Sequence, residues 1–109
     1  MLTKKIYVAA PYTKGDVAVN VKTAMDMASK LIELGYAPFC PHLTHFLHMA
    51  HPQPYETWLE LDNAFLPHCD ALLRLDGESS GADKEVALAI SLGIPVFYSL
   101  EDLMNHFKP

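Results

Sequence analysis

The stretch from Asp70 to Phe97 constrains the fold more than any other part of this chain. An apolar run over Ala71–Leu75 leads into a turn of small and polar residues, and a second apolar run begins at Ile94. Between the runs lies a helical pattern, Ser80–Leu92, that stops at a glycine. Apolar runs without polar alternation are typical of parallel strands that are covered on both faces. The stretch therefore predicts a strand, a turn, a helix and a second strand.

The rest of the chain repeats this alternation of strand and helix. Asp16 is a plausible N-cap for a long helix that Gly35 would close. The segment His42–Pro54 is rich in His and Pro, and we expect it to be irregular with one or two helical turns. The remaining elements are expected as strands at Lys5–Ala9, Tyr36–Cys40 and Ile94–Tyr98 and as helices at Glu56–Leu66 and Leu100–Phe107.

Alternating apolar strands and helices predict one α/β domain over residues 1–109. We expect a doubly wound, flavodoxin- or Rossmann-like parallel sheet of four to five strands with helices on both faces. Ligands of such sheets bind at the carboxyl ends of the strands, beside the N-termini of the following helices. Glu85, near the start of its helix, is placed to touch whatever binds there.

Composition narrows the function classes. The net charge of −5 argues against polymeric nucleic acid and anionic membranes as partners, and no apolar run reaches the roughly 20 residues of a membrane span. The N-terminal apolar segment is too short for a signal peptide, which favours a cytoplasmic protein. Cys40 and Cys69 are isolated, and we expect two reduced, buried thiols.

The first turn, A-A-P-Y-T-K-G-D, follows the first strand directly. Ala10 would allow a ligand close to the backbone, and the amides around Thr13 and Lys14 would attract an anion. The turn matches neither the P-loop nor the dinucleotide-binding pattern. A nucleotide or sugar-phosphate site and an ordinary turn with a solvated lysine both remain open.

The third turn, D-G-E-S-S-G-A-D-K-E, is the start of the Ser80–Leu92 helix. Ser80 followed by Asp83 fits a capping box, and Gly81 leaves the helix start bare enough for a ligand. Glu85 lies about one turn inside, where the helix dipole favours a carboxylate that could attack or stabilise an anomeric carbon. On spacing alone, a surface glutamate is an equally good interpretation.

Four histidines recur at every third position. His42 and His45 lie nearest the end of the second strand and are expected in a pocket wall, whereas a metal site is disfavoured because no carboxylate lies within the run. Asp62, in the helix before the central strand, could reach the ligand edge, while Asp70 lies at the opposite edge and is expected to be structural. Trp58 is expected to anchor the core.

The motifs I-Y-V-A-A-P-Y, C-D-A-L-L and S-S-G-A-D-K-E-V-A-L-A, together with Asp62 eight residues before Asp70, resemble the nucleoside 2-deoxyribosyltransferase superfamily and its small nucleotide N-glycosidase members. The resemblance implies that Glu85 is the nucleophile and that Tyr7 orients it. Asp62 would lie near the base and ribose. Ser79 would contact the 5′ side of the sugar, with Thr13, Lys14 and Gly15 adding to a phosphate pocket, and Tyr12 would line the base pocket.

Two departures from that family bear on the reaction. The chain ends at Pro109 without the long C-terminal segment of the transferases, which favours hydrolysis over base transfer, and the His42–His51 segment has no family counterpart. We expect cleavage of the N-glycosidic bond of a (deoxy)nucleoside or its 5′-monophosphate, by a homodimer that needs neither metal nor cofactor. A non-catalytic nucleotide or nucleotide-sugar sensor and a His-dependent metal hydrolase are the alternatives.

Overall fold

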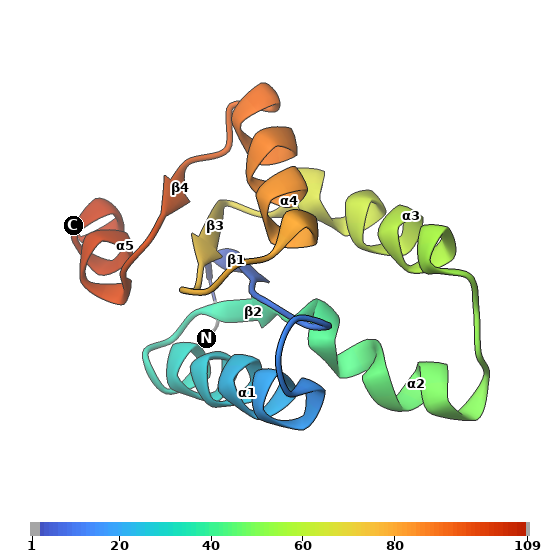
Figure 1. Ribbon diagram of the computed structural model, residues 1–109. Coiled ribbons are helices and arrows are strands. Elements are labelled where there is room, and N and C mark those ends of the chain that lie inside the picture. The colour runs from blue at the N-terminus through green and yellow to red at the C-terminus, as the bar shows by residue number, and fades with distance from the viewer. Residues whose placement is uncertain (1–2, 109) are drawn as a thin grey trace.

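The computed structural model describes residues 3–108 and has a parallel sheet between two layers of helices (Figure 1). The strands are β1 (Lys5–Ala9), β2 (Ala37–Phe39), β3 (Ala71–Arg74) and β4 (Val96–Phe97). The helices are α1 (Val17–Glu33), α2 (Thr44–Ala50), α3 (Tyr55–Phe65), α4 (Ser80–Ser91) and α5 (Leu100–Phe107), with short 3₁₀ turns at Pro41–Leu43 and Leu66–His68. This is the predicted α/β fold class.

The strand order is β2-β1-β3-β4, and every neighbouring pair is parallel. The chain leaves β1 toward β2 on one side and later crosses back to place β3 on the other side of β1. The order therefore reverses between β1 and β3, where a doubly wound sheet opens a crevice for ligands. In the register of this pair Tyr7 lies beside Leu72, and Ala9 beside Arg74.

Alternate residues of the strands face opposite layers. Tyr7, Ala9 and Leu72 pack with the buried residues of α4 and of the turn after α3, whereas Ile6 and Val8 pack with α1 and α5. Figure 1 shows α1 and α4 on opposite sides of the sheet. Because both faces are covered, the strands carry the continuous apolar runs seen in the sequence.

Local signals in the sequence explain the element boundaries. The Asp16 carboxylate accepts hydrogen bonds from the amides of Ala18 and Val19, and Gly35 follows the α1 C-cap with φ +90°, so both predicted ends of this helix are confirmed. The two edge strands are shorter than predicted. After Cys40 the chain enters a 3₁₀ turn, and after Tyr98 it reaches the Ser99 N-cap of α5, although the Pro95 carbonyl before β4 still accepts from the Leu72 amide at 2.9 Å.

The edge of the sheet at the amino-terminal ends of the strands agrees with the structural role predicted for Asp70. The Lys5 amide donates to the Asp70 carboxylate at 2.8 Å, which ties the start of β1 to the start of β3. Cys40 and Cys69 are free and buried. Across residues 3–108, no helix combines the length and the apolar character needed to span a bilayer.

Candidate active site

A cavity of about 780 Å³ lies at the carboxyl edge of the sheet, where the loops after β1, β2 and β3 meet α2, α3 and the start of α4. It therefore occupies the place where the strand order reverses. The residues on its wall that were predicted as site residues are Ala10, Tyr12, Thr13, Lys14, His42, His45, Asp62, Ser79, Ser80, Gly81 and Glu85. Two predicted residues are not part of the wall: Tyr7, which is fully buried in β1, and Gly15.

Glu85 lies in the second turn of α4 and is only 9% exposed. The Tyr7 hydroxyl donates a hydrogen bond to its carboxylate across 78 positions of sequence. Burial raises the pKa of Glu85 to about 7, while this hydrogen bond opposes the rise. Burial and the neighbouring Glu85 charge raise the pKa of Tyr7 far above its usual value, so the phenol remains a donor.

Asp62 is the second buried acid of the cavity. It lies in the penultimate turn of α3 and is 8% exposed. Its Oδ1 atom has no hydrogen-bond partner among residues 3–108, and burial raises its pKa to about 6. The Asp62 charge in turn raises the pKa of Glu85, so the two acids form an interacting pair. Two buried carboxyl groups with pKa values near neutrality are an arrangement suited to acid–base chemistry.

The loop after β1 forms one wall of the cavity. Asn20, in the first turns of α1, donates to the carbonyl oxygens of Tyr12 and Lys14 at 2.9 and 2.7 Å and so fixes the loop conformation. The Lys14 ammonium lies 3.3 Å from the Glu78 carboxylate on the facing loop, with both side chains largely exposed. An exposed pair of this kind is weak, which leaves Lys14 free to bind an anion instead.

The start of α4 forms the opposite wall of the cavity. Its N-cap differs from the predicted one. Ser79, not Ser80, is the N-cap, and its Oγ accepts from the Ala82 amide at 3.1 Å. The predicted capping box is wrong, because the helix begins at Ser80 and its N3 residue is Ala82, whose side chain cannot accept a hydrogen bond. Since the Ser79 hydroxyl oxygen accepts in the cap, its proton remains available to a ligand. Lys84, which sequence reasoning did not select, also lines the cavity.

The histidine series closes the cavity from α2 and the turn before it. The His42 ring lies 2.6 Å from the Pro11 carbonyl through Nε2, and His45 Nδ1 lies 2.6 Å from the Tyr12 hydroxyl. His48 also lines the cavity, and its Nδ1 accepts from the Trp58 indole at 2.8 Å. Each ring thus has a different partner. Among the residues that the structure describes, no three His, Cys, Asp or Glu side chains are grouped to hold a metal.

Trp58 corrects a second prediction. It was expected in the core, but it is half-buried and forms part of the cavity wall together with Tyr55 and Gln53. Helical periodicity identified the apolar side of α3 without revealing that this side faces a cavity. The pairing of a tryptophan with the regularly spaced histidine His48 could not be read from either motif alone.

The comparisons with known proteins agree with this fold. A model for a family described as "Domain of unknown function (DUF7768)" matches residues 4–99. None of the curated proteins matches the chain significantly. Among solved structures, a 2-deoxyribosyltransferase from the psychrotolerant bacterium Bacillus psychrosaccharolyticus superposes with a TM-score of 0.65 and 20% sequence identity. The match covers 92% of this chain and 78% of that chain. That enzyme is described as a biocatalyst for nucleoside synthesis.

Proposed function

The chain belongs to the DUF7768 family, whose description states no activity, and we propose from its site that it cleaves the N-glycosidic bond of a nucleoside or nucleoside 5′-monophosphate. The observation that carries the proposal is the buried Glu85 carboxylate, held by the Tyr7 hydroxyl, together with the buried Asp62, whose Oδ1 atom has no hydrogen-bond partner among residues 3–108. Glycosidic bond cleavage uses such a pair of carboxyl groups, one for the anomeric carbon and one for proton transfer. The similarity in fold to a 2-deoxyribosyltransferase supports the same chemistry.

In the first step Glu85 acts as the nucleophile. One of its oxygens forms a bond to C1′ while the C1′–N bond breaks, and the electron pair of that bond stays on the base nitrogen. The departing base takes a proton from Asp62, directly or through a water molecule. The sugar develops positive charge in the transition state, and the ionised Glu85 beside it offsets that charge.

In the second step a water molecule replaces the base. Asp62, now ionised, accepts a proton from the water as its oxygen attacks C1′, and the C1′–O bond to Glu85 breaks with its electron pair on the carboxylate. The products are the free base and the sugar or sugar phosphate, and both acids return to their starting states. A second base in place of water would give transfer instead of hydrolysis.

The pKa values of the two acids fit this sequence of steps. Because burial raises both values, to about 7 for Glu85 and about 6 for Asp62, the pair holds one proton near neutral pH. The one-proton form that the first step needs has Glu85 ionised and Asp62 protonated, and the hydrogen bond that Tyr7 donates increases the share of this form. We expect a bell-shaped pH dependence with its maximum between about pH 6 and 7.

We place the 5′ end of the substrate between the two loops. Ser79 would donate its hydroxyl proton, and the start of α4 offers amides with a favourable dipole. Lys14 on the loop after β1 and Lys84 on α4 supply positive charge from the two walls, in a chain whose net charge is −5. This charge placement favours a monophosphate over an unphosphorylated nucleoside.

We further propose that the protein works as a homodimer. Several large apolar side chains remain exposed on and beside α2, next to the cavity, and such clusters mark interaction surfaces. They are Leu43, Phe46, Leu47 and Met49. Light scattering on the purified protein would report a mass near 24 kDa for the dimer, against 12.1 kDa for the chain.

The experiment that tests the function is incubation with a panel of nucleosides and 5′-monophosphates, with free base followed by chromatography. We expect base release that Glu85→Gln abolishes, because the amide cannot attack C1′. Glu101→Gln, a matched change on α5 outside the cavity wall, is expected to retain it, since Glu101 is exposed. Base release by the Glu85 variant would refute the assigned nucleophile. Thermal stabilisation by a ligand without any release would instead establish a binding protein.

A further inference from the structure

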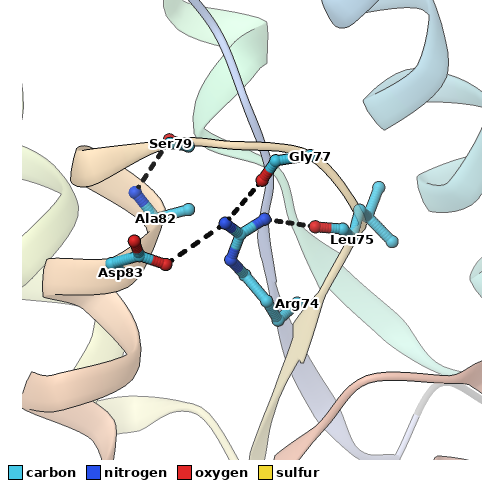
Figure 2. A network of polar contacts seen from close by, with 6 residues as sticks. All are labelled: Arg74, Leu75, Gly77, Ser79, Ala82 and Asp83. Atoms are coloured by element: carbon cyan, nitrogen blue, oxygen red, sulfur yellow. Dashed lines mark hydrogen bonds and ion pairs between the residues drawn. The ribbon is translucent and has the colours of Figure 1, made fainter.

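Arg74 is a buried cation at the carboxyl end of β3, and sequence reasoning gave it no role. Only 8% of the residue is exposed. Burying a guanidinium is costly unless its donors are paired, so its partners indicate why it is there. Figure 2 shows the guanidinium enclosed by the turn between β3 and α4. It donates to the carbonyl oxygens of Leu75 and Gly77, the latter at 2.7 Å, and to the Asp83 carboxylate at 3.2 Å.

These contacts join a strand, a turn and a helix that also carry Ser79 and Glu85 of the cavity wall. Asp83 lies in the first turn of α4, two residues before Glu85, and the turn carries Ser79. The guanidinium therefore sets how the start of α4 sits relative to β3. Lysine could not replace it, because a single ammonium lacks the planar fork that reaches carbonyl oxygens and a carboxylate together.

The clamped turn also holds the loop after β1. Gly77 has φ +116°, and a Cβ atom there would lie 2.7 Å from Cγ of Pro11. The turn and the loop are thus in close contact at this glycine. The Pro11 carbonyl in turn accepts from the His42 ring at 2.6 Å. Loops from three strands are in this way linked through the residues that Arg74 fixes.

Arg74 also acts through its charge. The groups that shift the pKa of Glu85 come from two strands and one helix. They are Tyr7 from β1, Arg74 from β3 and Asp62 from α3. Of these, Asp62 raises the pKa and Arg74 lowers it. The other ionisable groups on the cavity wall are Tyr12, Lys14, His42, His45, His48, Tyr55, Glu78 and Lys84.

We propose that Arg74 is a positioning residue of the active site, whose guanidinium fixes the start of α4 and favours the ionised form of Glu85. The role in catalysis rests on the proposed function, in which Glu85 must be ionised to attack. The two parts of the role are separable, because charge and hydrogen-bonding geometry are removed by different substitutions. Arg74→Lys keeps the charge and loses the fork, whereas Arg74→Gln loses the charge and keeps donors.

The test is a titration of the Glu85 carboxyl by ¹³C NMR in labelled protein, with the signal assigned by its absence in Glu85→Gln. We expect Arg74→Gln to raise the pKa of Glu85 by about 0.5 to 1 unit, as loss of a nearby opposite charge does. Arg74→Lys is expected to leave it unchanged and still lower kcat/KM roughly tenfold. An unchanged pKa in folded Arg74→Gln would overturn the electrostatic part.

A second measurement tests the clamp without changing the arginine. Asp83→Asn removes one exposed carboxylate, so the variant is expected to fold, and amide hydrogen exchange in the β3–α4 turn should accelerate severalfold. Unchanged exchange there would overturn the positioning part. Because neither measurement needs a substrate, a protein without base release would refute the proposed function and leave the role of Arg74 toward Glu85 still measurable.

Discussion

The substitution Glu85→Gln is expected to stabilise the protein while abolishing its activity. The pKa of Glu85 is raised from 4.5 to about 7 in the fold, chiefly by burial. A shift of this size corresponds to about 3 kcal/mol. Because the folded-state pKa lies above the unfolded one, this contribution to stability is fully present below about pH 4.5 and is lost as the pH rises through 7.

Glutamine removes that pH dependence and keeps an acceptor for the Tyr7 hydroxyl. The variant should therefore be more stable than the parent by about 2 to 3 kcal/mol at pH 8 and close to it at pH 5. Urea unfolding followed by circular dichroism at both pH values measures the difference. The control is Glu78→Gln, whose carboxylate is largely exposed and whose effect should stay within about 0.5 kcal/mol at either pH. A stability gain for Glu85→Gln that is equal at both pH values would refute the electrostatic explanation.

Three further substitutions test the site and its scaffold. Tyr7→Phe removes the hydrogen-bond donor to Glu85. We expect the pKa of Glu85 to rise by about 1 to 2 units and kcat/KM at pH 7 to fall roughly tenfold or more. An unchanged NMR titration of Glu85 would contradict this expectation. Asp62→Asn removes the proton donor, so kcat should fall about 100-fold and the alkaline limb of the pH–rate profile should disappear; a retained limb would assign it to another group. Gly77→Ala forces a Cβ atom against the Pro11 ring at positive φ and should lower the free energy of unfolding by about 2 to 3 kcal/mol, as measured in urea. Gly35→Ala, with open space around it, should lower it by about 1 kcal/mol. Equal losses would show that the contact with Pro11 is relieved by a shift of its neighbours.

The parts of the site that sequence predicts well are those fixed by strand and helix ends. Tyr7 and Glu85 lie on elements whose bounds the apolar runs and the glycine at the helix end define, and parallel strands bring their carboxyl ends to one edge. The placement of Asp62 follows from an α3 helix that leads into β3. Periodicity predicts the strands and helices that carry these residues, whereas their roles in the site were expected only from the family resemblance.

The parts that sequence does not predict depend on packing between segments. The helical spacing of Trp58 predicts a core residue. Its side of α3 instead faces the cavity, and its indole donates a hydrogen bond to His48. The cap shifts from Ser80 to Ser79 because the turn, held by Arg74, decides where helical conformation begins. Each of these outcomes depends on a tertiary contact, which local propensity does not contain.

The same contacts explain why a buried arginine accompanies two buried acids. In the first proposed step Asp62 is protonated and Glu85 ionised, so the charges of Glu85 and Arg74 offset each other, while burial is the main cause of the raised pKa values of both acids. An oxocarbenium-like transition state develops positive charge beside the ionised Glu85 carboxylate, which stabilises it. Electrostatic stabilisation of this kind acts on the transition state more than on a neutral substrate, which is the condition for catalysis. The stability that burial of Glu85 costs at alkaline pH and the rate enhancement that we propose therefore arise from the same buried carboxylate.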